Sequence, residues 1–129
     1  MSATAPHRVQ QRRIKGFRLP PHTRSVARPH PYGNAHRVGA MAFPVLPGGV
    51  LAPAEVCLAP VLAVASHRNE LLADPQTARA AREDLRGWNL ACFCGPDSPC
   101  HVDTLLLIAN CTDEQFAELL IPRGCPPPF

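Results

Sequence analysis

Proline restricts the fold of this chain more than any other residue, because it fixes the backbone φ angle and has no N–H group to donate. It occupies 16 of the 129 positions, against a typical share of about 5%. Much of the backbone must therefore lie in loops, turns and extended segments, and the first half is expected to be rich in loops. The total length suits one domain with one core.

The second half of the chain contains the clearest regular elements. The apolar run over 88–94 is typical of a buried strand. Around it we predict four helices, which cover residues 53–72, 74–87, 100–111 and 113–120. Short strands are expected over 8–14 and 25–27, whereas 41–52 is broken by proline and glycine and is predicted as loop.

This succession predicts a small single-domain α/β fold, in which a short, mostly parallel sheet is flanked by helices. We place the domain at residues 8–121. Residues 1–7 are expected to be a disordered N-terminus, and residues 122–129 an irregular tail.

Capping residues mark the predicted ends of the helices. Asp74 is a suitable N-cap with Pro75 at the first helical position, and Gly87 suits the position after the last turn. Ser98 and Pro99 are predicted to begin the next helix in the same way. In the first helix, Pro53 marks the expected start and Pro60 a kink or an interruption.

The charge of the chain is distributed unevenly. Residues 1–40 carry eight Lys or Arg and no acidic residue, whereas residues 41–129 carry five Arg and all ten Asp and Glu. Four of the six histidines also lie in the basic part. Such asymmetry predicts an anionic, phosphate-bearing partner for the N-terminal segment, namely a nucleotide or a nucleic acid. A solvated basic arm is the alternative.

The stretch "NLACFCGPDSPCH" over 89–101 brings three cysteines and a histidine close together in the sequence. Cys92 and Cys94 are two residues apart and therefore share one face of the predicted strand. Cys100 and His101 lie at the start of the following helix. The ends of strands and the beginnings of helices form the usual ligand crevice of an α/β sheet, so we expect these four side chains to line one crevice.

Three interpretations of this cluster stay open. In the first, Cys94, Cys100 and His101 are catalytic, and the helix dipole lowers the pKa of the Cys100 thiol. In the second, Cys92, Cys94, Cys100 and His101 bind a metal ion, most naturally zinc. In the third, the cysteines fill space as small core residues. Cys57, Cys111 and Cys125 have no companions and are expected to be structural or exposed.

A second group of candidate binding residues lies in the basic part. Arg28, Tyr32, Gly33 and Asn34 combine a guanidinium, an aromatic ring and a Gly-Asn turn, which together can face a flat or phosphorylated ligand.

Three blocks of the sequence, in this order, resemble a bacterial and phage family catalogued as domain of unknown function 4326. The blocks are "RVQQRRIKGFRLPP", "VARPHPYGN" and "LRGWNLACFCGPDSPCHVDTLLLIAN". The last block also resembles another α/β family, number 488. The resemblance implies functional positions at Arg12, Arg13, Lys15, Gly16, Arg28, Pro29, Gly33, Asn34, Gly87, Cys92, Cys94, Pro99, Cys100 and His101.

We therefore expect a protein that binds, and in one interpretation processes, a nucleotide or a nucleic acid. Its basic half, with Arg12, Arg13 and Lys15, would hold phosphates beside the Cys/His crevice. The alternative is a non-enzymatic, metal-stabilised module that binds nucleic acid or protein. No apolar run approaches the roughly 20 residues of a membrane helix, and no secretory signal is evident. A cytoplasmic location with reduced thiols is the resulting expectation.

Overall fold

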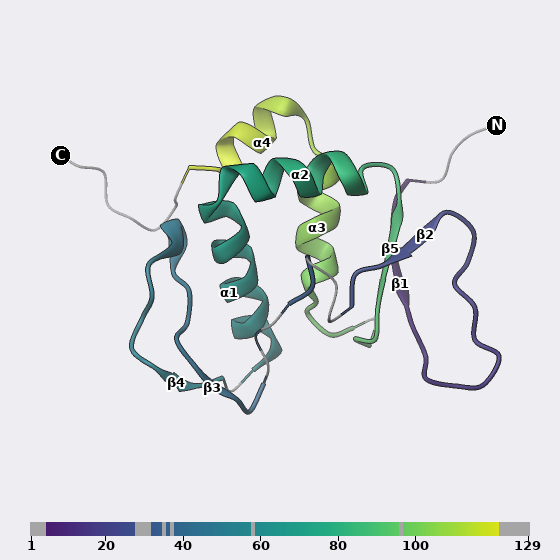
Figure 1. Ribbon diagram of the computed structural model, residues 1–129, viewed down its shortest axis with the longest axis horizontal. Coiled ribbons are helices and arrows are strands. Elements are labelled where there is room, and N and C mark those ends of the chain that lie inside the picture. Colours follow the sequence, from purple (N-terminus) through teal and green to yellow (C-terminus); the bar gives the residue numbers. More distant parts are fainter. Residues whose placement is uncertain are drawn as a thin grey trace.

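The computed structural model describes residues 5–27, 32–34, 36, 38–57, 59–95 and 97–121. It has the small α/β architecture that the sequence predicts (Figure 1). Its elements are, in chain order, β1 (Arg8–Gln10), β2 (Thr23–Ser25), β3 (Met41–Ala42), the 3₁₀-helix η1 (Pro47–Gly49), β4 (Glu55–Val56), α1 (Pro60–Ala73), α2 (Pro75–Leu85), β5 (Asn89–Cys92), α3 (His101–Asn110) and α4 (Asp113–Leu119).

The main sheet has three parallel strands in the order β1-β5-β2. The central strand β5 comes from the second half of the chain and pairs on each side with a strand from the basic half. Val9 pairs with Ala91 on one side, and Arg24 pairs with Leu90 on the other. Leu90 and Ala91 are completely buried, as the apolar run predicts. This order brings the basic segment to both sides of the cysteine motif.

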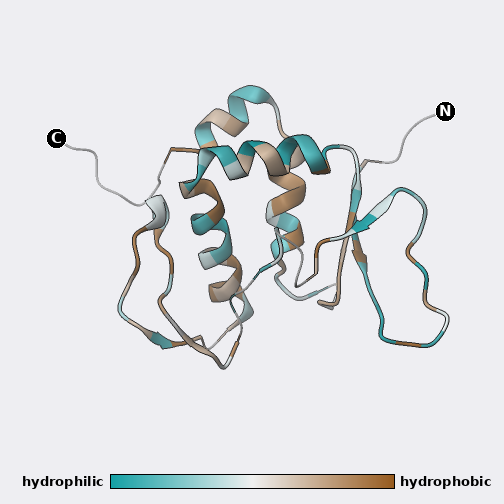
Figure 2. Cartoon of the chain, in the orientation of Figure 1, coloured by the Kyte–Doolittle hydropathy of each residue, from teal (hydrophilic) through white to brown (hydrophobic). Residues whose placement is uncertain are grey.

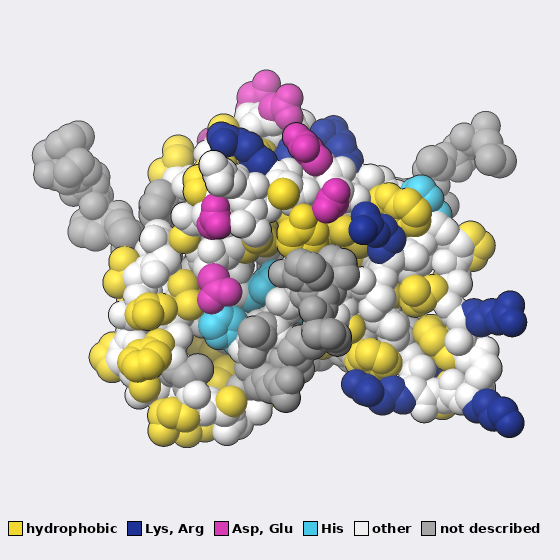
Figure 3. Space-filling view, viewed as in Figure 1, with side chains coloured by type: hydrophobic (Ala, Val, Ile, Leu, Met, Phe, Trp, Pro, Cys, Tyr) yellow, Lys and Arg dark blue, Asp and Glu magenta, His cyan; other side chains and the backbone are white. Residues whose placement is uncertain are grey.

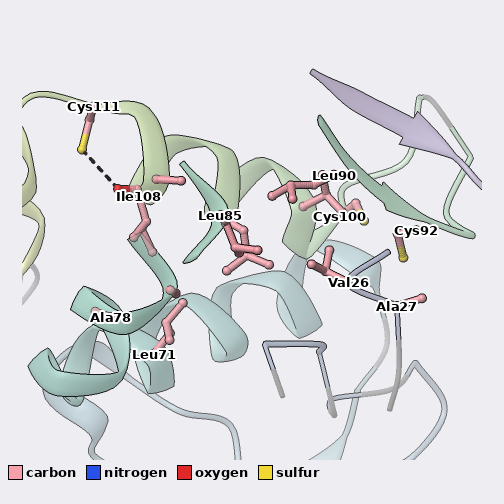
Figure 4. Close-up of a cluster of buried hydrophobic side chains, with 14 of the residues drawn as sticks. Val26, Ala27, Leu71, Ala78, Leu85, Leu90, Cys92, Cys100, Ile108 and Cys111 are labelled. Atoms are coloured by element: carbon pink, nitrogen blue, oxygen red, sulfur yellow. Dashed lines mark hydrogen bonds between the residues drawn. The ribbon is translucent and has the colours of Figure 1, made fainter. Parts of the chain in front are cut away.

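The helices lie to one side of this sheet in the view of Figure 1. Helix α3 packs against β5 and β1, and α1 and α2 pack against α3 and against each other. Figure 2 shows apolar residues concentrated along β5 and along α3. Figure 4 shows the core between these elements, with Val26, Leu85 and Leu90 near its centre and Cys92 and Cys100 at one end. The cysteine cluster therefore rests on the end of the core.

Helix α1 is shorter than predicted, because it begins at Pro60 instead of Pro53. Pro60 occupies the first turn of the helix, where the missing N–H costs nothing, and does not form a kink. The residue before a proline disfavours the helical region, and Ala59 is accordingly extended, with a φ of −150°. The segment that precedes it includes β4, which pairs in antiparallel fashion with β3.

Two further predictions are shifted. The strand expected at 25–27 lies at Thr23–Ser25, and Val26 and Ala27 follow it as buried residues. Ser98 and Pro99 do not start helix α3. Its N-cap is Cys100, which is extended and whose carbonyl accepts the N–H of Asp103 at 3.1 Å.

The segment predicted as loop over 41–52 contains small elements of its own. They are strand β3, the 3₁₀-helix η1 and a bridge between Val45 and Leu51. Apart from these, the segment is a loop. It lies against α1, and it forms one wall of a cavity described below.

The caps of α2 confirm the sequence prediction. Asp74 accepts the backbone N–H of Thr77 at 3.3 Å, Pro75 occupies the first turn, and Gly87 has a left-handed φ of +82°. Among the described residues, no helix combines the length and apolarity needed to cross a membrane.

The expected disordered N-terminus and irregular tail lie largely outside the described residues, which omit 1–4 and 122–129. The backbone of His7 already pairs with the sheet: its N–H donates to the Oδ1 of Asn89 at 3.0 Å, and its carbonyl accepts the N–H of Leu90.

Candidate functional site: a pocket lined by three thiols

Cys92, Cys94 and Cys100 come together at the end of strand β5. Their sulfur atoms all lie within 4.8 Å of one another, and those of Cys92 and Cys94 are 3.7 Å apart. Cys92 is the last residue of the strand, Cys94 lies in the bend after it, and Cys100 is the N-cap of α3. The strand–turn–helix geometry anticipated from the sequence thus produces a cluster that can hold a metal ion.

The pKa values of the three thiols are shifted in different directions. Hydrogen bonding from Cys100 lowers the pKa of the Cys92 thiol to about 5. The same hydrogen bond, followed by burial, raises the pKa of Cys100, and burial raises the pKa of Cys94. The predicted low pKa of Cys100 is therefore wrong, because hydrogen bonding to Cys92 and burial raise the pKa of this thiol.

His101 lies beside the cluster and is fixed by the sheet. Its Nε2 atom lies 2.8 Å from the carbonyl oxygen of Val26, so this nitrogen carries the proton in the neutral ring. Its Nδ1 atom lies 3.7 Å from the sulfur of Cys100. His101 does not belong to the group of ligand atoms within 4.8 Å. Of the four ligands in the metal interpretation, the structure thus brings the three cysteine sulfurs together and places His101 beside one of them.

A second histidine, His67, packs against His101. The rings of His67 and His101 meet edge to face, with centroids 5.3 Å apart. The Nε2 atom of His67 lies 3.0 Å from the carbonyl oxygen of Tyr32, whereas its buried Nδ1 atom has no hydrogen-bond partner among the described residues. Burial lowers the pKa of His67 to about 4, so this ring is neutral at pH 7.

The three cysteines line a pocket of about 480 Å³, which we call the thiol pocket. Its other walls come from the loop after β1, from the segment between β2 and β3, from helix α1, and from the turn between β5 and α3 with the first residue of α3. They are formed by Arg13, Ala27, Asn34, His36, Val38, Pro60, Ala63, Val64, Phe93, Ser98, Pro99 and His101. The volume is in the range of pockets that bind small molecules. The basic half and the cysteine motif therefore meet in one site.

Only one of the three predicted basic ligands in the loop after β1 reaches this pocket. The guanidinium of Arg13 lies 4.2 Å from the centre of the Phe93 ring, and both residues line the thiol pocket. Arg12 and Lys15 are exposed and do not line it. Figure 3 shows dark-blue basic side chains projecting from the lobe that carries this loop.

The predicted turn of the second group has mainly structural contacts. The Nδ2 of buried Asn34 donates to the carbonyl of Ala63 at 3.1 Å, and its Oδ1 accepts the N–H of His36 at 2.9 Å. Asn34 thus ties the loop to α1 while it lines the pocket. The hydroxyl of Tyr32 donates to Asp84 on α2, away from this pocket. Gly33 is half-buried, and Arg28 and Pro29 lie outside the described residues.

Sequence reasoning missed Arg8 as a residue of the site. This side chain is 14% exposed, donates to the carbonyl of Gly95 and pairs with Asp103 at 3.2 Å. It therefore fastens the turn between Cys94 and Cys100 to strand β1. His36 was missed as well. It lines the pocket and lies 3.3 Å from Glu70. No local pattern marks either residue, since their partners are distant in the sequence.

The other cysteines have separate surroundings. Cys57 is half-buried and its thiol donates to the carbonyl of Ala59, and Cys111 is buried beside Arg82. Cys125 lies outside the described residues.

A family model described as "Domain of unknown function (DUF4326)" matches residues 9–111, a range that includes the lining residues of the thiol pocket given above. No curated protein and no solved structure matches the chain significantly.

Proposed function

The chain belongs to the DUF4326 family, and we propose that it binds a phosphate-bearing ligand, a nucleotide or a nucleic acid, in the thiol pocket. One observation carries this proposal: Arg13 of the basic half lines the same pocket of about 480 Å³ as the three cysteines. A guanidinium at the wall of a pocket is the preferred protein group for phosphate. The exposed Arg12 and Lys15 on the same loop add a positive field that attracts anions.

Binding to Arg13→Ala and to Arg18→Ala tests this proposal. Arg18 is exposed on the same loop and does not line the pocket, so it is the matched control. Loss of a charge-assisted hydrogen bond costs about 1.5–3 kcal/mol, which weakens binding roughly tenfold to a hundredfold. Calorimetry with mononucleotides and with a 5′-phosphorylated oligonucleotide should show this loss for Arg13→Ala only. Affinity should also fall as salt increases. Equal affinities of the two variants would contradict the assignment.

We further propose that Cys92, Cys94 and Cys100 hold a zinc ion at the floor of this pocket. Sulfurs placed about 2.3 Å from a tetrahedral zinc ion are about 3.8 Å from one another. The distance of 3.7 Å between the sulfurs of Cys92 and Cys94 matches that spacing. Three protein ligands leave one position of the tetrahedron open, as in catalytic zinc sites. Because all three residues line the thiol pocket, ligands can approach this position from it.

The zinc content of serine variants tests the metal proposal. The purified chain is expected to retain one zinc per molecule, and Cys94→Ser and Cys100→Ser are expected to lose it. Cys57→Ser is the control, because Cys57 lies outside the cluster. Zinc that survives in all variants, or that is absent from the wild type after growth in zinc, would contradict the proposal.

The catalytic interpretation of Cys94, Cys100 and His101 makes the opposite prediction for alkylation. A reactive thiolate must be accessible, yet Cys92, which has the lowered pKa, is only 8% exposed. This burial favours metal binding over nucleophilic attack. In a time course with iodoacetamide, metal-bound thiols should be protected until a chelator is added. Rapid labelling of Cys94 or Cys100 without chelator would support the catalytic interpretation instead.

A further inference from the structure

A second cavity adjoins the thiol pocket and has a different chemical character. It has a volume of about 400 Å³ and lies between helix α1 and the segment from β3 to β4; we call it the apolar cavity. His36 and Ala63 line both cavities. The two cavities are therefore neighbours that share these two wall residues.

The walls of the apolar cavity are largely uncharged. Besides four alanines, the aliphatic side chains and prolines that line it are Pro44, Val45, Leu46, Pro53 and Leu62. Glu55 is the only acidic residue among its described lining residues, and His36 is the only one that can carry a positive charge. Such a cavity favours an apolar or aromatic group and disfavours a phosphate.

Two polar side chains inside this cavity can orient a heterocycle. The N–H of Val45 donates to the hydroxyl of Ser66 at 3.2 Å, and the carbonyl of Val45 accepts the Nδ2 of Asn69 at 2.8 Å. These bonds leave the hydroxyl hydrogen of Ser66 as a donor and the amide oxygen of Asn69 as an acceptor. One donor and one acceptor in an apolar setting are what the edge of a nucleobase requires.

We propose that the ligand of this protein is a mononucleotide, with its base in the apolar cavity and its phosphate beside Arg13 in the thiol pocket. This inference rests on the phosphate-binding function proposed above and names its substrate class. A nucleic-acid strand normally binds along an open basic groove with exposed aromatic rings on which bases stack. Here Arg13 stacks on one face of the Phe93 ring, which is 37% exposed, and the apolar cavity shares the wall residues His36 and Ala63 with the pocket. This arrangement favours a short ligand over a strand.

Calorimetry on the full chain can separate the two ends of the ligand. The probes are AMP, GMP, CMP and UMP, together with ribose 5-phosphate, inorganic phosphate and a single-stranded oligonucleotide. At least one mononucleotide should bind about tenfold more tightly than ribose 5-phosphate, since the base adds buried apolar contact. Arg13→Ala should weaken the mononucleotide and ribose 5-phosphate alike.

A substitution that fills the apolar cavity gives the decisive comparison. Ala54 lines the cavity from an exposed loop position, so Ala54→Phe can occupy the space with little risk to the core. Ala80 is exposed on α2 and lines neither cavity, so Ala80→Phe is the matched control. Ala54→Phe should abolish the advantage of the mononucleotide over ribose 5-phosphate and leave ribose 5-phosphate binding unchanged. Ala80→Phe should change neither.

The possible outcomes distinguish this inference from the function on which it rests. If ribose 5-phosphate binds through Arg13 but no base improves affinity, or Ala54→Phe has no effect, the mononucleotide inference is overturned and the phosphate function stands. If the oligonucleotide binds most tightly and is insensitive to Ala54→Phe, the ligand is a nucleic acid. If no phosphate-bearing probe binds at millimolar concentration, both proposals are wrong.

Discussion

Replacing Arg82 by methionine is predicted to lower the free energy of unfolding by about 3–4 kcal/mol. Arg82 lies on α2, is only 7% exposed, and holds the C-terminal end of helix α3. Its guanidinium donates to the carbonyl of Ile108 at 2.8 Å and to the carbonyl of Cys111 at 2.7 Å. It also stacks 5.0 Å from the ring centre of Phe116.

The carbonyl contacts account for most of this magnitude. Each charge-assisted hydrogen bond contributes about 1.5–3 kcal/mol, and methionine retains part of the buried apolar contact. The ion pair with Asp113 contributes little, because the Asp113 side chain is 92% exposed and solvent screens it. Asp113→Asn is therefore expected to cost less than about 1 kcal/mol.

Urea denaturation followed by circular dichroism measures these differences. Arg79→Met is the control, since Arg79 is exposed on the same helix. The Tm of Arg82→Met should be roughly 10–20 °C lower than that of the wild type. A loss below about 1 kcal/mol for Arg82→Met, or an equal loss for Asp113→Asn, would refute the reasoning.

Two further predictions concern the surroundings of the thiol pocket. The pKa of His67 is about 4 in the folded chain and near 6.5 in the unfolded chain. As the pH falls, the unfolded chain therefore takes up a proton first. The free energy of unfolding should fall between about pH 6.5 and pH 4, by at most about 3 kcal/mol. His67→Gln should flatten this slope in urea titrations, and an unchanged slope would exclude His67 as its cause. Arg8 binds the carbonyl of Gly95 and so fastens the turn after β5 to β1. Arg8→Ala should therefore loosen this turn and increase the rate at which metal-free Cys94 is alkylated. An alkylation rate equal to that of the wild type would show that the turn keeps its conformation without Arg8.

The parts of the fold that sequence predicts well are those set by local chemistry. Helix α2 is delimited by Asp74, Pro75 and Gly87, each in the conformation its residue type favours. The buried run of β5 is equally clear, and its end meets the start of the next helix in any α/β unit. The meeting of Cys92, Cys94 and Cys100 could therefore be anticipated.

The errors arise where one residue type permits more than one structure or where contacts are distant. Pro60 fits a kink, an interruption or a first turn, and in the structure it occupies the first turn after the extended Ala59. Ser98 has the chemistry of an N-cap, but the extended Cys100 takes that position. Arg8 contacts a turn 87 residues away, which no local pattern reveals. Nor does a local pattern reveal that Arg13 lines the pocket while Arg12 does not, because this difference depends on the path of the loop after β1.

X-ray absorption at the zinc edge tests the central claim most directly. For the zinc-loaded chain we predict three sulfur neighbours at about 2.3 Å and one nitrogen or oxygen neighbour at about 2.0–2.1 Å. Cys57→Ser should leave this shell unchanged, whereas Cys94→Ser, which is expected to lose the zinc, should give no zinc edge. A shell of nitrogen and oxygen alone, or one with fewer than three sulfurs in the wild type, would contradict a zinc site formed by Cys92, Cys94 and Cys100.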